Sequence, residues 1–227
     1  MTKARAAAFP ARRRHAKLAC MPRPTFSAVL FAVWLACPIH VHAADRLDCA
    51  GLFGRDTSHA ALVQAFGAEN VVYKRIDAPQ GSTGMATILF ERDRKRRLLF
   101  EWRDENNRAR PIYIGIDAKS EWIAPPGIHA GMPIEEVEKL NGKPFRLNGF
   151  GWDLGGAARF GKQDGRLGGL PGGCHLGLAF EPTAEGLPLG GKYRPLSGNV
   201  DLRSDMPLVR EIRPVGVEIL VVFSENH

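Results

Sequence analysis

Alternating hydrophobic and polar residues dominate the chain after residue 44, and this pattern predicts many strands and few helices. Strands are expected at 71–77, 85–92, 97–103, 111–117, 120–124, 145–153, 174–181 and 215–223. The last of them, VGVEILVVF, is the most strongly β-biased run and is therefore predicted to be a central strand. The segments 85–92 and 97–103 flank a charged turn and predict a hairpin.

Two short amphipathic helices are also predicted, each ended by a glycine. The first begins after the capping pair Thr57-Ser58 and ends before Gly67. The second begins at Pro133, which is tolerated in a first turn, and ends before Gly142. Its apolar side consists of Ile134, Val137 and Leu140.

These elements predict an α+β fold, an antiparallel sheet with short helices packed on one face. The two helix-to-strand passages are 75 residues apart, with Gly67 aligning on Gly142. This spacing suggests two tandem helix-plus-sheet modules, 45–126 and 127–227, which either stay separate or share one core.

Residues 1–44 have the composition of a secretory signal peptide, cleaved before Asp45. Seven Lys or Arg and no acid precede an apolar run at 26–39, which is short for a membrane span of about 20 residues. Met21 opens a shorter version of the same pattern and is an alternative translation start.

The leader predicts Sec export to the periplasm as a soluble protein that is not transmembrane once processed. Secretion from the cell is the alternative destination. The pair Arg12-Arg13 and the residue Cys37 leave twin-arginine and lipoprotein signals as alternatives, although their surroundings match those motifs poorly.

Export changes the net charge that the folded protein is expected to carry. The whole chain carries +7, and removing the seven basic residues of the leader leaves 31 − 7 = 24 basic against 24 acidic residues. A nucleic-acid partner is therefore not expected. The basic run 92–97 between two predicted strands is interpreted as a solvated hairpin turn, with a patch for anionic lipid as the alternative.

Two cysteines remain after the leader, Cys49 and Cys174. In an oxidising compartment two cysteines usually pair, so a disulfide between them is predicted. No CxxC motif and no Cys/His cluster at ligand spacing is present, so neither a metal site nor a cofactor is expected.

Catalytic signatures are missing as well: the sequence contains no HExxH, no GxSxG and no P-loop. A non-catalytic binding protein is therefore the first hypothesis, and its partner is an envelope protein or a cell-wall or lipid component. A small exported hydrolase is an alternative, and needs a pocket where Glu101 or Asp153 meets His129 or His175. A structural envelope component is a third possibility.

Exposed aromatic residues near the glycine-rich stretch GFGWDLGG, and the basic turn, are the candidate contacts, since aromatics often anchor interfaces. The candidate binding surface consists of Phe150, Trp152, Asp153, Trp102, Arg94, Lys95 and Arg96.

The run GMPIEEVEKLNGKP at 131–144 resembles the helical signature of β-lactamase-inhibitor-protein-like modules. These modules also occur in small lipoproteins of the outer-membrane barrel-assembly machinery. The stretch 95–152, with RLLFEW, GKPF and GFGW in order, also resembles uncharacterised exported proteins of Gram-negative bacteria. The resemblance implies an exported α+β fold whose sheet binds other proteins. Pro133 stands where the signature has Ser or Thr, and no contact residue is carried over.

Overall fold

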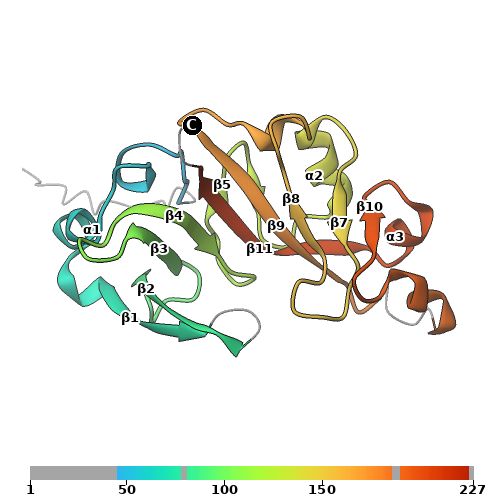
Figure 1. Cartoon of the computed structure of the whole chain (residues 1–227), viewed down its shortest axis with the longest axis horizontal. Helices are drawn as coiled ribbons and strands as arrows, with labels where there is room; N and C mark the ends of the chain where they lie inside the picture. The colour runs from blue at the N-terminus through green and yellow to red at the C-terminus, as the bar shows by residue number, and fades with distance from the viewer. Residues whose placement is uncertain (1–44, 78–80, 186–189, 225–227) are drawn as a thin grey trace, which may run out of the picture. The chain divides into compact units, whose positions relative to one another are not determined.

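The computed structural model describes residues 45–77, 81–185 and 190–224, which belong to one compact unit (Figure 1). The predicted leader, residues 1–44, lies outside the described residues. The fold is α+β, as predicted, and is built on one seven-stranded antiparallel sheet in the order β1-β2-β3-β4-β11-β9-β8. Its strands are β1 (Val71–Asp77), β2 (Thr83–Leu89), β3 (Leu98–Asp104), β4 (Ala109–Ile116), β8 (Ala157–Arg159), β9 (Cys174–Pro182) and β11 (Pro214–Phe223).

Smaller elements surround this sheet. The helices are α1 (His59–Phe66), α2 (Ile134–Asn141) and α3 (Pro207–Glu211). Two further strand pairs are β5 (Ile123–Ala124) with β6 (Ile128–His129), and β7 (Arg146–Asn148) with β10 (Asp201–Arg203). Short 3-10 turns are η1 (Gly51–Phe53), η2 (Ala68–Asn70), η4 (Arg166–Gly168) and η5 (Gly190–Leu196).

Strand β11 is central, as its β-bias predicted, because it pairs with β4 on one side and with β9 on the other. Strands β1 to β4 come from the first predicted module, whereas β8, β9 and β11 come from the second. One hydrophobic cluster contains buried residues from both halves of the chain. The sheet and the core are therefore shared.

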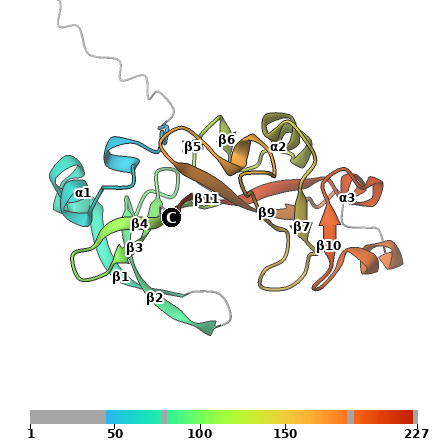
Figure 2. The ribbon, with the colours of Figure 1, turned by 45° about the horizontal axis from the view of Figure 1, so that its top comes forward.

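The two faces of the sheet differ. Phe100, Ile114 and Val221 point to one face, where they are buried in the core together with Leu62 of α1 and Val137 of α2. The helices therefore cover this face. In Figure 2 the strands on either side of β11 bend away from the helices, so the other face is concave. We call it the open face.

The predicted cap of α1 and the predicted glycine ends of α1 and α2 are confirmed. The Ser58 hydroxyl accepts the backbone N–H of Ala61 (3.2 Å) and caps α1. Gly142 ends α2 in the left-handed conformation (φ 85°), which glycine adopts without a Cβ penalty. Pro133 is the residue before α2 rather than its first residue.

Two strand predictions are wrong. Of the segment 120–124 only Ile123–Ala124 is a strand, and it pairs with β6 instead of extending the large sheet. Of the segment 145–153 only Arg146–Asn148 is a strand, and the residues after it turn back. A Cβ on Gly149 would lie 2.5 Å from the carbonyl oxygen of Gly198, so this glycine permits close backbone packing rather than strand pairing.

Candidate functional site

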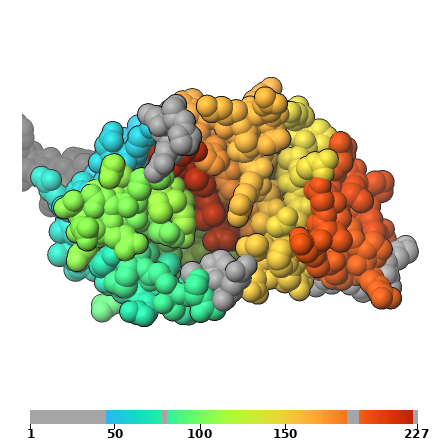
Figure 3. Space-filling view, viewed as in Figure 1, coloured from blue at the N-terminus to red at the C-terminus, as the bar shows by residue number. Residues whose placement is uncertain are grey.

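The open face is hollowed over its central strand. A cavity of about 250 Å³ is lined in part by Leu99, Tyr113 and Gly115, with Glu218 and other charged residues around it. Figure 3 shows this hollow as a depression with β11 at its floor, between β3–β4 on one side and β9 on the other. The hollow is therefore a feature of the sheet itself.

Two glycines flank Leu220 on this face, and one of them, Gly115, lines the hollow. Leu220 of β11 stands in register with Gly115 of β4 and with Gly177 of β9. Neighbours directly across an antiparallel pair point to the same face, so both missing side chains leave room beside Leu220. A Cβ at Gly115 would lie 3.6–3.7 Å from its nearest neighbours, which is ordinary contact, so packing does not demand glycine there.

A β-bulge directly precedes the acidic residue of the hollow. The register between β11 and β9 shifts between Gly216 and Glu218, which makes Val217 an extra residue. Gly216 is buried on the helix side, whereas Glu218 pairs with Ala179 and lies on the open face. Regular alternation would have placed positions 216 and 218 on the same face.

The pKa values of two polar groups in the hollow are raised. Partial burial raises the pKa of the Glu218 carboxyl, although its side chain still reaches solvent, because the walls remove water from the charged form. Burial likewise raises the pKa of Tyr113, whose phenol is also hydrogen-bonded to Glu101 and lies near Glu218. Both carboxylates disfavour a negative charge on the phenol.

Two of the predicted contact residues are in the core. Trp102 is 2% exposed and donates its indole N–H to the Thr87 hydroxyl oxygen (2.8 Å), which also contacts Nδ1 of His59 (2.9 Å). Phe150 is 1% exposed. Neither side chain is available to a partner.

Trp152 and Asp153 are exposed, as a contact surface requires. Trp152 is 37% exposed, and its indole N–H is bonded to the carbonyl oxygen of Gly149 (2.9 Å). It lines a second, more open hollow of about 370 Å³ with Arg146 and Arg159. The structure does not place Trp152 among the lining residues of the hollow over β11.

The predicted basic turn connects β2 to β3, as expected. Arg94 is exposed, whereas Lys95 pairs with Glu121 (2.7 Å). The Arg96 guanidinium pairs with Asp45 (2.8 Å) and lies 4.0 Å from the centre of the Phe90 ring. Two basic side chains of this turn therefore form ion pairs within the protein.

Glu101 and His175, one pair proposed for a hydrolase, do not meet. Glu101 and His175 lie in one row across the open face, separated by Tyr113 and Val222. Three strand spacings make roughly 14 Å. His129 is exposed, and its Nδ1 contacts the carbonyl oxygen of Ala130 (2.9 Å). Among residues 45–77, 81–185 and 190–224, no group of three or more His, Cys, Asp or Glu could hold a metal ion.

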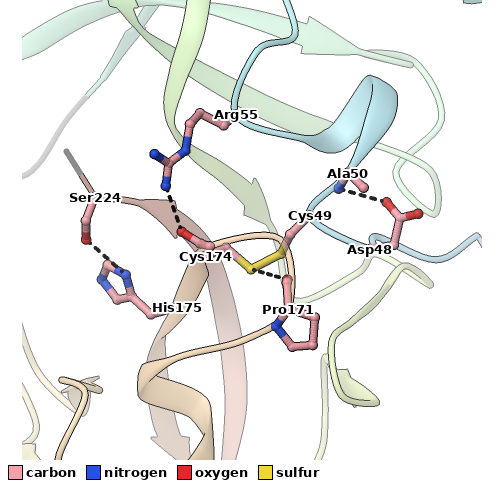
Figure 4. Close-up of a disulfide and its surroundings, with 9 residues drawn as sticks. Asp48, Cys49, Ala50, Arg55, Pro171, Cys174, His175 and Ser224 are labelled. Atoms are coloured by element: carbon pink, nitrogen blue, oxygen red, sulfur yellow. Dashed lines mark hydrogen bonds between the residues drawn. A yellow bond between two sulfur atoms is a disulfide. The ribbon is translucent and has the colours of Figure 1, made fainter. Parts of the chain in front are cut away.

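The predicted disulfide joins Cys49 to Cys174, with the two Cα atoms 6.2 Å apart across 125 residues of sequence (Figure 4). Beside it, the Ser224 hydroxyl lies 3.3 Å from Nδ1 of His175, whose pKa is lowered by partial burial. Among the described residues, no carboxylate is hydrogen-bonded to the other nitrogen of this ring, so they lack a third group that would orient a serine–histidine pair.

No family model, no curated protein and no solved structure matches this chain. The resemblance to inhibitor-protein-like modules therefore stays a prediction. None of the helices in the described part of the chain is long and apolar enough to cross a membrane.

Sequence reasoning missed the hollow, which Tyr113, Gly115 and Glu218 help to line. It also missed the row in which Leu220 lies between Gly115 and Gly177. A usable indication was present, because glycine inside a strand marks a bulge or a place where another backbone or ligand approaches closely. Gly115 and Gly177 both interrupt otherwise apolar strand patterns.

Proposed function

We propose that this chain is an exported, periplasmic, non-catalytic binding protein that holds a partner from the cell envelope on the open face of its sheet. The observation that carries the proposal is the hollow on the face without helices, lined by Leu99, Tyr113 and Gly115 beside the central strand β11. The leader-like composition of residues 1–44 and the disulfide support export.

A protein partner fits this site better than a small ligand. The hollow of about 250 Å³ is below the roughly 300–1,000 Å³ of ordinary small-molecule sites. Around it the open face also carries the partly exposed apolar side chains of Leu99, Leu220 and Val222. A hollow of this size within a larger apolar surface suits one inserted side chain of a docked protein.

The test is photo-crosslinking in intact cells with p-benzoylphenylalanine placed at Val222, which lies on the open face. The same residue at Lys139, which is exposed on α2, is the matched control on the helix side. We expect one dominant adduct of defined mass from position 222 and none at that mass from position 139. Its protein component is then identified by mass spectrometry.

Equal adducts from both positions, or none from position 222, would count against binding through the open face. An adduct from position 139 alone would move the partner surface to the helix side. A processed protein without any adduct would favour the structural envelope component.

A further inference from the structure

Three charged residues form a row across one end of the hollow. Leu98 pairs with Ile116, and Ile116 pairs with Ile219. One step further along each chain, Arg97, Asp117 and Glu218 therefore follow one another on the open face, and all three line the hollow.

The charges in this row do not balance. Asp117 has Arg97 on one side, and its carboxylate also accepts the backbone N–H of Lys119 (2.9 Å). Glu218 pairs with the uncharged Ala179 on the β9 side. Within the described part of the chain, no ion pair to Glu218 is found. The carboxylates that line the hollow therefore outnumber its cations, since Arg97 is its one basic lining residue.

The surroundings of Glu218 are apolar along one direction and acidic along another. Leu99 and Leu220 flank Gly115 across the strands, and a Cβ on this glycine would lie 3.6 Å from the ring of Tyr113. Asp77 adds a third carboxylate to the lining, against the single guanidinium of Arg97. A long side chain with an apolar stem and a positive end matches both parts of this surface.

We infer that the hollow receives a lysine or arginine side chain from the partner protein, with its cation at the Glu218 carboxylate and its stem over Gly115 and Leu220. This inference rests on the proposed function, since it names the chemistry of the partner at the same site. The carboxylates are too dispersed to form a metal site in the described residues, so an extended organic cation fits better than a divalent ion.

The experiment uses three matched pentapeptides, acetyl-Thr-Val-X-Val-Thr-amide, where X is lysine, norleucine or glutamate. Norleucine keeps an apolar stem without the charge. Binding to the isotope-labelled full-length mature protein is followed by NMR through the backbone amides of Gly115 and Leu220. We expect the lysine peptide to bind roughly tenfold more tightly than the norleucine peptide, as one charge-assisted hydrogen bond provides. The glutamate peptide should bind weakest.

The Glu218→Gln variant should lose the preference for lysine and bind both peptides at the norleucine level. Glu105→Gln, in the exposed β3–β4 turn, is the control and should retain the preference. Equal affinity for lysine and norleucine in the wild-type protein overturns the inference but leaves sheet-face binding standing. A preference that survives Glu218→Gln, or no shift in the hollow with any peptide, also overturns it. The crosslink from position 222 tests the proposed function independently of charge.

Discussion

A carboxylate that loses water without gaining a cation lowers the stability of the folded state, and Glu218 is placed in this way. It lies on the open face in regular alternation with Leu220 and Val222, and the bulge at Val217 separates it from Gly216 on the helix side. The sequence VGVEILVVF predicts the strand but not the bulge, because regular alternation and a bulged strand have the same composition. The change of face between Gly216 and Glu218 therefore could not be predicted from the sequence.

Replacing Glu218 by Gln should stabilise the protein at neutral pH. Burial raises the pKa of this carboxyl above its ordinary value of 4.5, so the folded state holds the proton more tightly than the unfolded state. The ionised carboxyl does not destabilise the folded state below the pKa that it has in the unfolded state. The destabilisation appears as the pH rises through the pKa that it has in the folded state. We expect a gain of a few tenths to about 1 kcal/mol at about pH 7, reduced by solvent screening, and none at about pH 3.5.

Urea unfolding at both pH values measures this difference. Glu105→Gln should leave the free energy of unfolding unchanged at both. A Glu218→Gln variant that is less stable than the wild type at neutral pH would show that the carboxylate has a stabilising partner.

Single elements were predicted best where a capping residue or a glycine marks their ends. Both α1 and α2 end at the predicted glycines, and Ser58 caps α1. The strand expected at 145–153 failed because Gly149 to Gly156 packs closely against distant backbone: a Cβ at Gly156 would lie 2.0 Å from the carbonyl oxygen of Phe180. Such long-range approaches leave no local periodicity, and so the sequence favoured an extended segment.

Gly142→Ala tests the end of α2. The residue has φ 85°, and an added Cβ would lie 3.4 Å from Nε of Arg166, which is not a clash. The expected loss of about 1 kcal/mol is therefore conformational. Denaturant unfolding measures it against Gly169→Ala, a position that is exposed, extended (φ −161°) and without neighbours within 4 Å. Equal stability of both variants would contradict a conformational requirement at Gly142.

At the scale of the described unit, strands from both halves of the chain share one sheet, and the disulfide connects the residues before α1 to the start of β9. The pairing was predictable because only two cysteines follow the leader. The pairing of the two halves in one sheet was not predictable, since the β4–β11 pairing joins segments about a hundred residues apart. The concave face follows from that pairing and was therefore also beyond the sequence.

Replacing both Cys49 and Cys174 by Ala should lower the free energy of unfolding by about 2–5 kcal/mol, because the bond closes a loop of 125 residues in the unfolded chain. Urea unfolding with and without reductant measures the loss, and reductant should have no effect on the double variant. A wild-type protein that is equally stable when reduced would contradict this account.

The central claim is that the hollow in the open face holds the partner, and filling the hollow tests it most directly. Gly115→Val adds a β-branched side chain, favoured in strands, where the added Cβ makes only ordinary contacts. The yield of the in-cell crosslink from position 222 is the measurement, with Gly169→Val as the control. We predict that Gly115→Val folds with a wild-type melting temperature and loses at least about tenfold in crosslink yield, as steric exclusion of one anchoring side chain implies. An undiminished yield in the folded Gly115→Val protein would contradict the claim.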